Sequence, residues 1–292
     1  MTKLRGGMGL LAQSQKDYVT IRLQVTRGKL SIEQLNGIAD VLDNYGKGFA
    51  IPTIRKGLEI PWIKFEDSPK VLEEFKKLGL KAGSCGTKIR TIVACAGMDH
   101  CPLGLVDIEG AYAKLKDEYY ERDTPTKFKI SICGCPMACS HPHINDFGII
   151  GRIRPKIIAE KCDGCGICAR VCKGEEAEAK YKVEQDAIVE GNPPKIDYDR
   201  CIGCGLCMRS CPREAIAAEE AGFALFIGGK GGRHPRFGEE VVGLVSEEEM
   251  FRILDKTLKY FKKFAQGKER IVEVINRKGI EHFKNYVLEG GE

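Results

Sequence analysis

The chain has 292 residues, of which 43% are hydrophobic and 30% charged, an ordinary globular balance with room for two or three modest domains. No apolar run approaches the roughly 20 residues of a transmembrane helix, and the start, MTKLRGGMGLLAQSQKDY, makes a poor signal peptide, so we expect a cytoplasmic protein without a membrane span. The net charge is +5, but the cations are interspersed with acidic residues, which argues against a nucleic-acid partner and favours a body that holds anionic ligands.

Residues 1–80 are predicted to form an N-terminal ferredoxin-like α+β unit. After a flexible arm at 1–16, residues from Tyr18 to Val25 alternate between apolar and polar side chains, as in a strand. Ser31 with Gln34 predicts a capping box that opens a helix, which Gly46 ends. The side chains expected on the inner face of this helix are Ile32, Leu35, Ile38 and Leu42.

Two short strands follow, around residues 49–54 and 57–62, and a second helix runs from Ser68 to Gly79. The resulting order, strand-helix-strand-strand-helix, indicates helices packed on one face of a sheet.

A second α+β unit is predicted from residues 81–155 and 219–292. Its first half carries strands in KIRTIVACAG, KFKISIC and DFGIIG and a helix at 107–120. Its second half carries a strand in FALFIGG and helices beginning near Ser246, Lys268 and Gly279. Residues 156–218 are rich in cysteine and glycine and lack strong periodicity, so we interpret them as an insertion into this unit.

The insertion contains two copies of the spacing C-x2-C-x2-C-x3-C, which bacterial ferredoxins use for [4Fe–4S] clusters. In that pattern the fourth cysteine of each run ligates the other cluster. One cluster is therefore assigned to Cys162, Cys165, Cys168 and Cys211, and the other to Cys201, Cys204, Cys207 and Cys172. Zinc bound to the same cysteines is the weaker alternative. A module of this kind transfers single electrons.

Four further cysteines pair as Cys95-x5-Cys101 and Cys135-x3-Cys139, on loops after predicted strands. Two separated pairs can hold zinc or one more [4Fe–4S] cluster, and spacing alone leaves the two open, with buried structural cysteines as a third reading.

These pairs and their surroundings resemble the sirohaem-dependent sulfite and nitrite reductases. That family has C-x5-C followed by C-x3-C. The stretches PTKFK, IRTIVACAG, PTIRKGLEI and IGGKGGRHPR are similar to its Pro-x-Lys-Phe-Lys strand, its arginine before the first cysteine, its Thr-x-Arg region and its Gly-Gly-Lys-x-Gly-Arg segment. The resemblance covers most of residues 18–290. It implies a fold of sulfite reductase-type α/β sandwich units with an inserted two-cluster ferredoxin domain.

The resemblance implies that Cys95, Cys101, Cys135 and Cys139 bind the third cluster, with Cys139 bridging it to the sirohaem iron. Arg55, Arg90, Lys127 and Lys129 would surround the substrate anion. Sulfite is a small dianion, and fixed cations would bind it and stabilise charge as its oxygens leave as water. Lys127 and Lys129 alternate along a predicted strand and so share a face. On the residues alone, a solvated strand edge is the competing reading.

The carboxylates of sirohaem would be held by a Gly-rich turn, whose residues are Gly228, Gly229, Lys230, Gly231, Gly232 and Arg233. A Gly-rich hairpin without a ligand is the alternative. Near the cluster loops, His100, His141 and His143 are expected to hydrogen-bond or pack rather than ligate. Met137 departs from the family's usual asparagine. Cys85 and Cys133 are left over, and we expect both to be core thiols, although Cys133 could face the site.

The layout, one copy of the α+β unit with a ferredoxin insertion, looks like dissimilatory-type sulfite reductases and the small C-type chains of anaerobic sulfite reductases. Two-copy members take their cations from one copy and their cluster cysteines from the other, so the resemblance implies a homodimer with shared sites. The expected activity is six-electron reduction of sulfite to sulfide, fed through two ferredoxin clusters by a separate electron donor protein. Nitrite reduction to ammonia and a non-catalytic electron-transfer subunit are the alternatives.

Overall fold

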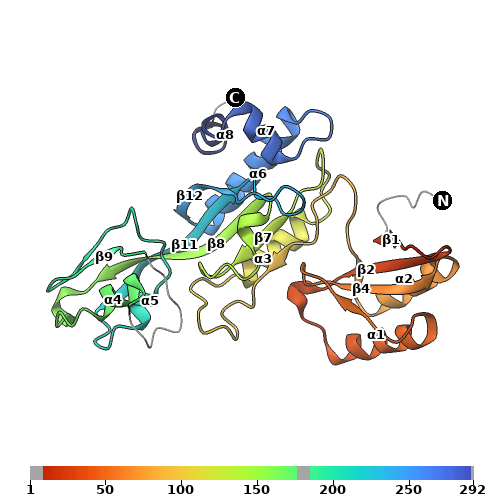
Figure 1. Cartoon of the computed structure of the whole chain (residues 1–292), viewed down its shortest axis with the longest axis horizontal. Helices are drawn as coiled ribbons and strands as arrows, with labels where there is room; N and C mark the ends of the chain where they lie inside the picture. Colours follow the sequence, from red (N-terminus) through yellow and green to blue (C-terminus); the bar gives the residue numbers. More distant parts are fainter. Residues whose placement is uncertain (1–8, 176–184, 291–292) are drawn as a thin grey trace.

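The computed structural model describes residues 9–175 and 185–290, and its parts lie in a row along the longest axis (Figure 1). The N-terminal unit stands at one end, a mixed sheet with its helices in the middle, and the cysteine-rich insertion at the other end. Each part has its own cluster of buried apolar side chains. Within the described ranges, no helix combines the length and apolar character needed to cross a membrane.

The N-terminal sheet has the strand order β1-β2-β4-β3, and a short strand β5 also pairs with β2. The strands are β1 (Leu10–Ala12), β2 (Tyr18–Gln24), β3 (Ile51–Pro52), β4 (Leu58–Lys64) and β5 (Lys81–Ala82). The predicted strand from Tyr18 is confirmed. The arm expected at 1–16 is partly wrong, because Leu10 pairs with Ile21 in β1, while residues 1–8 lie outside the described residues.

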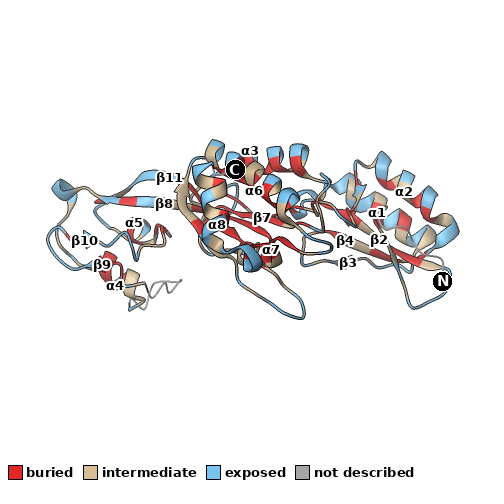
Figure 2. Cartoon of the chain, turned by 90° about the horizontal axis from the view of Figure 1, so that it is seen from above, coloured by how far each residue is buried: buried red, intermediate tan, exposed pale blue. Residues whose placement is uncertain are grey.

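Helices α1 (Ile32–Tyr45) and α2 (Ser68–Lys77) cover one face of this sheet (Figure 2). The predicted capping box is present: the Gln34 backbone N–H donates to Ser31 Oγ at 3.1 Å, and the Ser31 N–H donates to Gln34 Oε1 at 3.1 Å. The predicted inner face is partly wrong, since Ile32 is 78% exposed and Leu35 51% exposed. The buried stripe centres on Ile38 and Val41, which puts Ile32 near the opposite side of the helix.

The central sheet has the strand order β12-β11-β8-β7-β6. Its strands are β6 (Val93–Ala94), β7 (Ile130–Cys133), β8 (Phe147–Ile157), β11 (Ile216–Ile227) and β12 (Glu239–Val245). The pairs β6–β7 and β7–β8 are parallel, and β8–β11 and β11–β12 are antiparallel. Strand β7 is shorter than predicted. It begins at Ile130, so Lys127 and Lys129 precede it.

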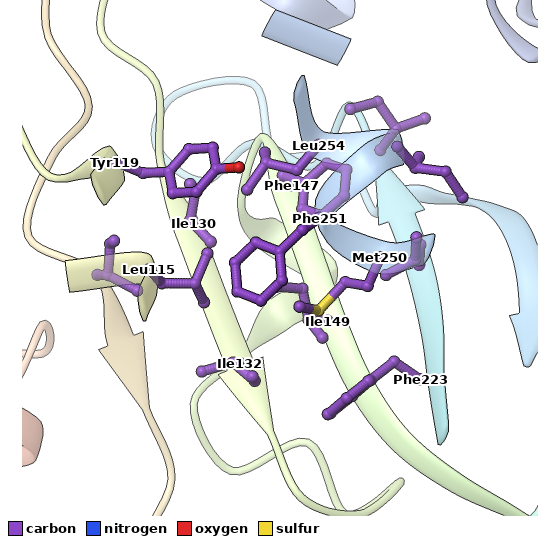
Figure 3. Packing of buried hydrophobic residues seen from close by; sticks show 14 of the residues in the cluster. Leu115, Tyr119, Ile130, Ile132, Phe147, Ile149, Phe223, Met250, Phe251 and Leu254 are labelled. Carbon is purple, nitrogen blue, oxygen red and sulfur yellow. The ribbon is translucent and has the colours of Figure 1, made fainter. Parts of the chain in front are cut away.

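Helices pack against this sheet and bury its core (Figure 3). They are α3 (Glu109–Lys114), continued by a π-helical turn (Leu115–Tyr119), α6 (Glu247–Phe264), α7 (Ile271–Lys278) and α8 (Ile280–Lys284), continued by a second π-helical turn (Asn285–Glu289). Phe147 and Ile149 of β8 meet Met250, Phe251 and Leu254 of α6 in the core. The helices predicted near residues 107, 246, 268 and 279 are therefore confirmed.

Strands β8 and β11 run on beyond the core as a two-stranded ribbon that carries the insertion (Figure 2). Their pairing is continuous from Phe147 opposite Ile227 to Ile157 opposite Ile216, apart from one bulge. The insertion itself holds α4 (Ile167–Lys173), β9 (Ile188–Val189), β10 (Lys195–Ile196) and α5 (Leu206–Arg209).

Candidate functional site

The four predicted cations, Arg55, Arg90, Lys127 and Lys129, line one pocket of about 380 Å³. This cation pocket lies between the N-terminal unit and the central sheet. Arg55 comes from the turn between β3 and β4, Arg90 precedes β6, and the two lysines precede β7. Residues from three distant stretches of sequence thus converge on one place, as a binding site for an anion requires.

Arg55 is held by the turn that presents it and by two acceptors across the domain boundary. The Gly57 N–H donates to Thr53 Oγ1 at 3.0 Å, which closes the turn. The Arg55 guanidinium donates to Asn145 Oδ1 at 2.8 Å and to the Thr91 carbonyl at 2.5 Å. Burial lowers the pKa of Arg55 to about 10, so the guanidinium remains charged at neutral pH.

Arg90 is fixed in the same way by backbone carbonyls. Its guanidinium donates to the Ser84 carbonyl at 2.8 Å and to the Gly86 carbonyl at 2.9 Å. Cys85 lies half-buried in this turn, so the expectation of a core thiol is wrong for this cysteine. The turn at residues 84–86 therefore positions a cation, a role that its sequence did not suggest.

Lys129 is the cation whose charge is easiest to lose. Burial lowers its pKa to about 8, and the positive charges of Arg55 and Arg270 add to this effect, while Asp146 opposes it. At neutral pH the ammonium form predominates, but the neutral amine is accessible within one pH unit. Lys129 can therefore both attract an anion and donate a proton.

A buried ion pair lies beneath the cation pocket and was missed by the sequence analysis. Arg270 donates to the Asp146 carboxylate at 2.6 and 3.2 Å, and the Lys129 backbone N–H donates to it at 2.9 Å. Burial raises the pKa of the fully buried Asp146, and Arg270 opposes this. The pair joins the loop before β8 to the start of α7, residues that are 124 apart in sequence.

The four cysteines outside the insertion that were predicted to bind a cluster gather at the other end of β6 and β7. They are Cys95, Cys101, Cys135 and Cys139. Cys95 directly follows β6, and Cys135 follows β7 after one glycine. Burial raises the pKa of Cys135, and the neighbouring thiols of Cys95, Cys101 and Cys139 raise it further, so all four lie within electrostatic reach of one another. Cys139 is exposed, so its thiol is accessible to a bound group.

The extra thiol Cys133 is fully buried behind this set. Its Sγ lies 2.8 Å from Ser140 Oγ and accepts the Ser140 N–H at 3.2 Å. The expectation of a core thiol is therefore confirmed for Cys133.

Arg27 is another residue that the sequence did not point to. It lies in a 3-10 turn (Thr26–Gly28) with a left-handed φ of 53°, and it is only 6% exposed. Its side chain reaches the Ala96 carbonyl and the Glu109 carboxylate, and its backbone N–H donates to Tyr112 Oη at 3.3 Å. The N-terminal unit is thereby hydrogen-bonded, through Arg27, to the loop between Cys95 and Cys101.

Within the insertion, the eight cysteines line two separate cavities. The outer set comprises Cys162, Cys165, Cys168 and Cys211. The inner set comprises Cys172, Cys201, Cys204 and Cys207. In both sets the fourth cysteine of one run joins three of the other, as the ferredoxin pattern predicts.

The donor chemistry of both sets fits an iron–sulfur cluster, because each set gathers four thiols around one cavity and a cubane takes four thiolates. Gly166 and Gly205, both at positive φ, allow the turns that lead into α4 and α5 beside these cavities.

The Gly-rich turn at residues 228–233 is not part of the described lining of the cation pocket, but it lies against a residue that supports the pocket, since the Gly228 N–H donates to the Asp146 carbonyl at 3.0 Å. Lys230 pairs with Glu273 at 3.2 Å. A Cβ added to Gly229 would lie 2.3 Å from the His143 carbonyl, so close packing explains this glycine without a ligand. The His143 ring packs edge-on against Phe226 at 4.6 Å, as expected of a packing residue.

The cation pocket lies at the amino-terminal ends of β6 and β7. The cysteines Cys95, Cys101, Cys135 and Cys139 (the Cys95 set) lie at the carboxyl-terminal ends of the same strands. Because β6 and β7 are parallel, Arg90 and Lys129 precede them at one edge, and Cys95 and Cys135 follow them at the other. The four residues of β7 alone span about 13 Å.

Comparison with known proteins agrees with this geometry. The family description "Nitrite and sulphite reductase 4Fe-4S domain" matches residues 85–290, and "Nitrite/Sulfite reductase ferredoxin-like half domain" matches residues 11–78. The chain belongs to the nitrite and sulphite reductase family. It is thus an oxidoreductase of a family that binds a [4Fe–4S] cluster, and the resemblance read from its motifs is confirmed.

Two relatives of this reductase are a coenzyme F420-dependent sulfite reductase of Methanocaldococcus jannaschii and the C-type chain of the anaerobic sulfite reductase of Salmonella typhimurium. The first is 35% identical over 97% of this chain, which spans only 44% of that protein's length. The second is 28% identical over 92% of this chain and 83% of its own. A crystal structure of dissimilatory sulfite reductase I has the same fold, with a TM-score of 0.74 at 20% identity, covering 94% of this chain and 69% of that one.

Proposed function

We propose that this reductase converts sulfite to sulfide in a six-electron reduction. The observation that carries the proposal is the convergence of Arg55, Arg90, Lys127 and Lys129 on one pocket. The M. jannaschii and S. typhimurium relatives are both named sulfite reductases, which favours sulfite over nitrite as the substrate.

The cofactors of this proposal are one sirohaem and three [4Fe–4S] clusters. When bound, they would supply electrons and an iron for the substrate. Cys95, Cys101, Cys135 and Cys139 would hold the cluster next to the sirohaem, with Cys139 as the bridging ligand. The inner and outer sets would hold the other two. Lys230 and Arg233 remain candidates for the sirohaem carboxylates.

The chain's own residues would bind and protonate the substrate. Arg55 and Arg90 present planar guanidinium groups that bind oxyanions, and both are pinned by hydrogen bonds, so little conformational entropy is lost when an anion binds. Lys129 would donate protons as oxygens leave as water, since its pKa is lowered to about 8. Lys127 adds a further positive charge to the pocket.

We propose that the active form is a homodimer. The cation pocket and the Cys95 set lie at opposite edges of β6 and β7, so the cations of one protomer would face the group held by Cys139 of the other. An isologous dimer would create two equivalent sites. Sedimentation of the active enzyme as a monomer would disprove this arrangement.

The rest of the proposal concerns organisation and partners. The proposed division into an N-terminal unit (1–80), a catalytic domain (81–155 and 219–292) and an inserted ferredoxin domain (156–218) is supported by the separate apolar clusters in these three parts. A separate electron donor protein would supply the electrons, in the cytoplasm.

An anaerobic absorption spectrum, with iron and sulfide quantified and the tetrapyrrole extracted, tests the proposal. Three cubanes and a haem predict about thirteen irons per chain together with sirohaem bands. Sulfite-dependent oxidation of reduced methyl viologen, compared with nitrite at equal concentration, then tests the substrate. Fully loaded clusters without a tetrapyrrole would support an electron-transfer protein instead.

A further inference from the structure

The inner and outer cysteine sets stand at different points along the β8–β11 ribbon. The loop of the inner set meets the ribbon at Ile153, whose N–H donates to the Gly203 carbonyl at 3.1 Å. The cavity of the outer set is lined by Ile157 and Ile216, at the far end of the ribbon. The inner cavity is itself lined by Pro155, so along β8 the two sets are offset by two to four residue steps, about 7–13 Å. In both views α5 lies on the side of the insertion that faces the core (Figures 1 and 2).

Arg209 connects the inner set to the loop of Cys101. It ends α5, two residues after Cys207, and its guanidinium donates to the Pro102 carbonyl and, at 2.8 Å, to the Gly104 carbonyl. Pro102 directly follows Cys101, and the Gly104 N–H donates back to the Cys101 carbonyl at 3.1 Å. One side chain therefore connects the helix that carries Cys207 to the loop that follows Cys101.

The surrounding packing shows that this contact is close. A Cβ added to Gly205, which precedes α5, would lie 2.7 Å from Leu105 Cδ2. The Leu105 N–H donates to the Gly134 carbonyl at 2.9 Å, next to Cys135. The segment at residues 101–105 is thus held by α5 on one side and by the end of β7 on the other.

We propose that Arg209 is a positioning residue that docks the inner set on the Cys101 loop. The inner set is then the insertion's redox contact with the central sheet, and the outer set is the part that faces the electron donor. The inference rests on the proposed function, since it takes these cysteines to hold clusters. An arginine suits the role because two nitrogens of its rigid planar fork each donate to one of the two carbonyls, whereas a lysine offers a single nitrogen on a flexible stem.

The first experiment measures hydrogen exchange of residues 101–106 in the holoprotein. Arg209→Ala removes two hydrogen bonds from this segment, so its exchange should become roughly tenfold faster. Arg154→Ala is the matched control, because Arg154 also lies at the ribbon but pairs with Glu219 at 3.6 Å. Its exchange in 101–106 should equal that of the wild type. Equal exchange in Arg209→Ala and wild type would overturn the docking role.

The second experiment measures magnetic coupling between reduced clusters by electron paramagnetic resonance. Removing the inner cluster with Cys204→Ala should abolish the broadening of the signal from the Cys95 set, and Arg209→Ala should weaken it. Removing the outer cluster with Cys165→Ala should leave it. The reverse pattern for the two cysteine variants would overturn the assignment. Wild-type protein that binds no cluster iron would contradict the proposed function, while the exchange result would still decide whether Arg209 docks the loop.

Discussion

The two edges of β6 and β7 carry two sites that are built in different ways. At the amino-terminal ends of the strands, protein groups hold the two arginines. Arg55 donates to Asn145, and Arg90 donates to the carbonyls of Ser84 and Gly86. At the carboxyl-terminal ends of the strands, Cys139 is exposed, and the thiols of the Cys95 set raise the pKa of Cys135. Four thiols therefore lie close together there. The comparison teaches that hydrogen bonds within the fold orient the arginines of the cation pocket, whereas the cysteine set brings together like groups that disfavour each other's ionisation.

Removal of a cysteine is the strongest test of this contrast. Cys135→Ala should lower the iron content by one cluster and reduce the rate of sulfite reduction to background, because the bridged cofactor loses its support. The measurements are iron and sulfide content and viologen oxidation.

Cys85→Ser is the matched control. Cys85 is half-buried and its Sγ makes a 4.0 Å contact with the Gly83 carbonyl, so content and rate should stay near those of the wild type. Full activity in Cys135→Ala would remove Cys135 from the cluster.

The second prediction concerns how much the buried ion pair beneath the cation pocket contributes to the free energy of unfolding. Asp146→Asn leaves Arg270 buried without its counter-charge, which should lower the free energy of unfolding by about 3–5 kcal/mol. Urea denaturation measures this loss. Glu240→Gln breaks the more exposed pair with Arg152 and should cost less than about 1 kcal/mol. Equal losses in the two variants would show that burial of the Asp146 pair has no special weight.

The pH dependence of sulfite binding tests the charge of Lys129. Its pKa is lowered to about 8, so the ammonium is present below that pH and is lost above it. The KM for sulfite should therefore rise by up to about tenfold between about pH 7 and pH 9. Lys129→Arg keeps the charge throughout this range and should flatten the profile. An unchanged rise in Lys129→Arg would assign the titration to another group.

The smallest expected effect concerns the turn that presents Arg55. Thr53→Ala removes the acceptor for the Gly57 N–H, a hydrogen bond worth about 1 kcal/mol, so the KM for sulfite should rise a few-fold with little change in iron content. Thr53→Ser keeps the hydroxyl and should restore the wild-type KM. A loss of iron in Thr53→Ala would mean that the two edges are less independent than their construction implies.

Sequence patterns predicted those features that local chemistry specifies. The capping box of α1 depends on two residues three apart, and it is present. The ferredoxin spacing predicted which fourth cysteine joins which set, because loop length restricts the way that a chain can wrap a cubane. The reductase resemblance named the four cations that share a pocket.

Features that depend on distant contacts were beyond the sequence. Asp146 and Arg270 are 124 residues apart in the chain, and neither lies in a sequence motif that predicts a buried ion pair. Arg27 could not be distinguished from a surface arginine, because its burial depends on how the N-terminal unit docks on the Ala96 carbonyl. Ile32 and Leu35 fit an apolar helix stripe, but the sheet beneath α1 meets only the Ile38 and Val41 side.

The ribbon of β8 and β11 has a mechanical consequence. The part of β11 that precedes its pairing with β12 runs from Ile216 to Gly222, so the ribbon extends about 20 Å from the core, and its antiparallel partner makes it stiffer than a flexible linker of equal length. The insertion is therefore held at a fixed distance from the core by two paired strands and not by a flexible linker. Its reach from the core is set by the number of paired residues, so deleting two residues from each strand would shorten that reach by about 7 Å and keep every side chain on its own face of the ribbon.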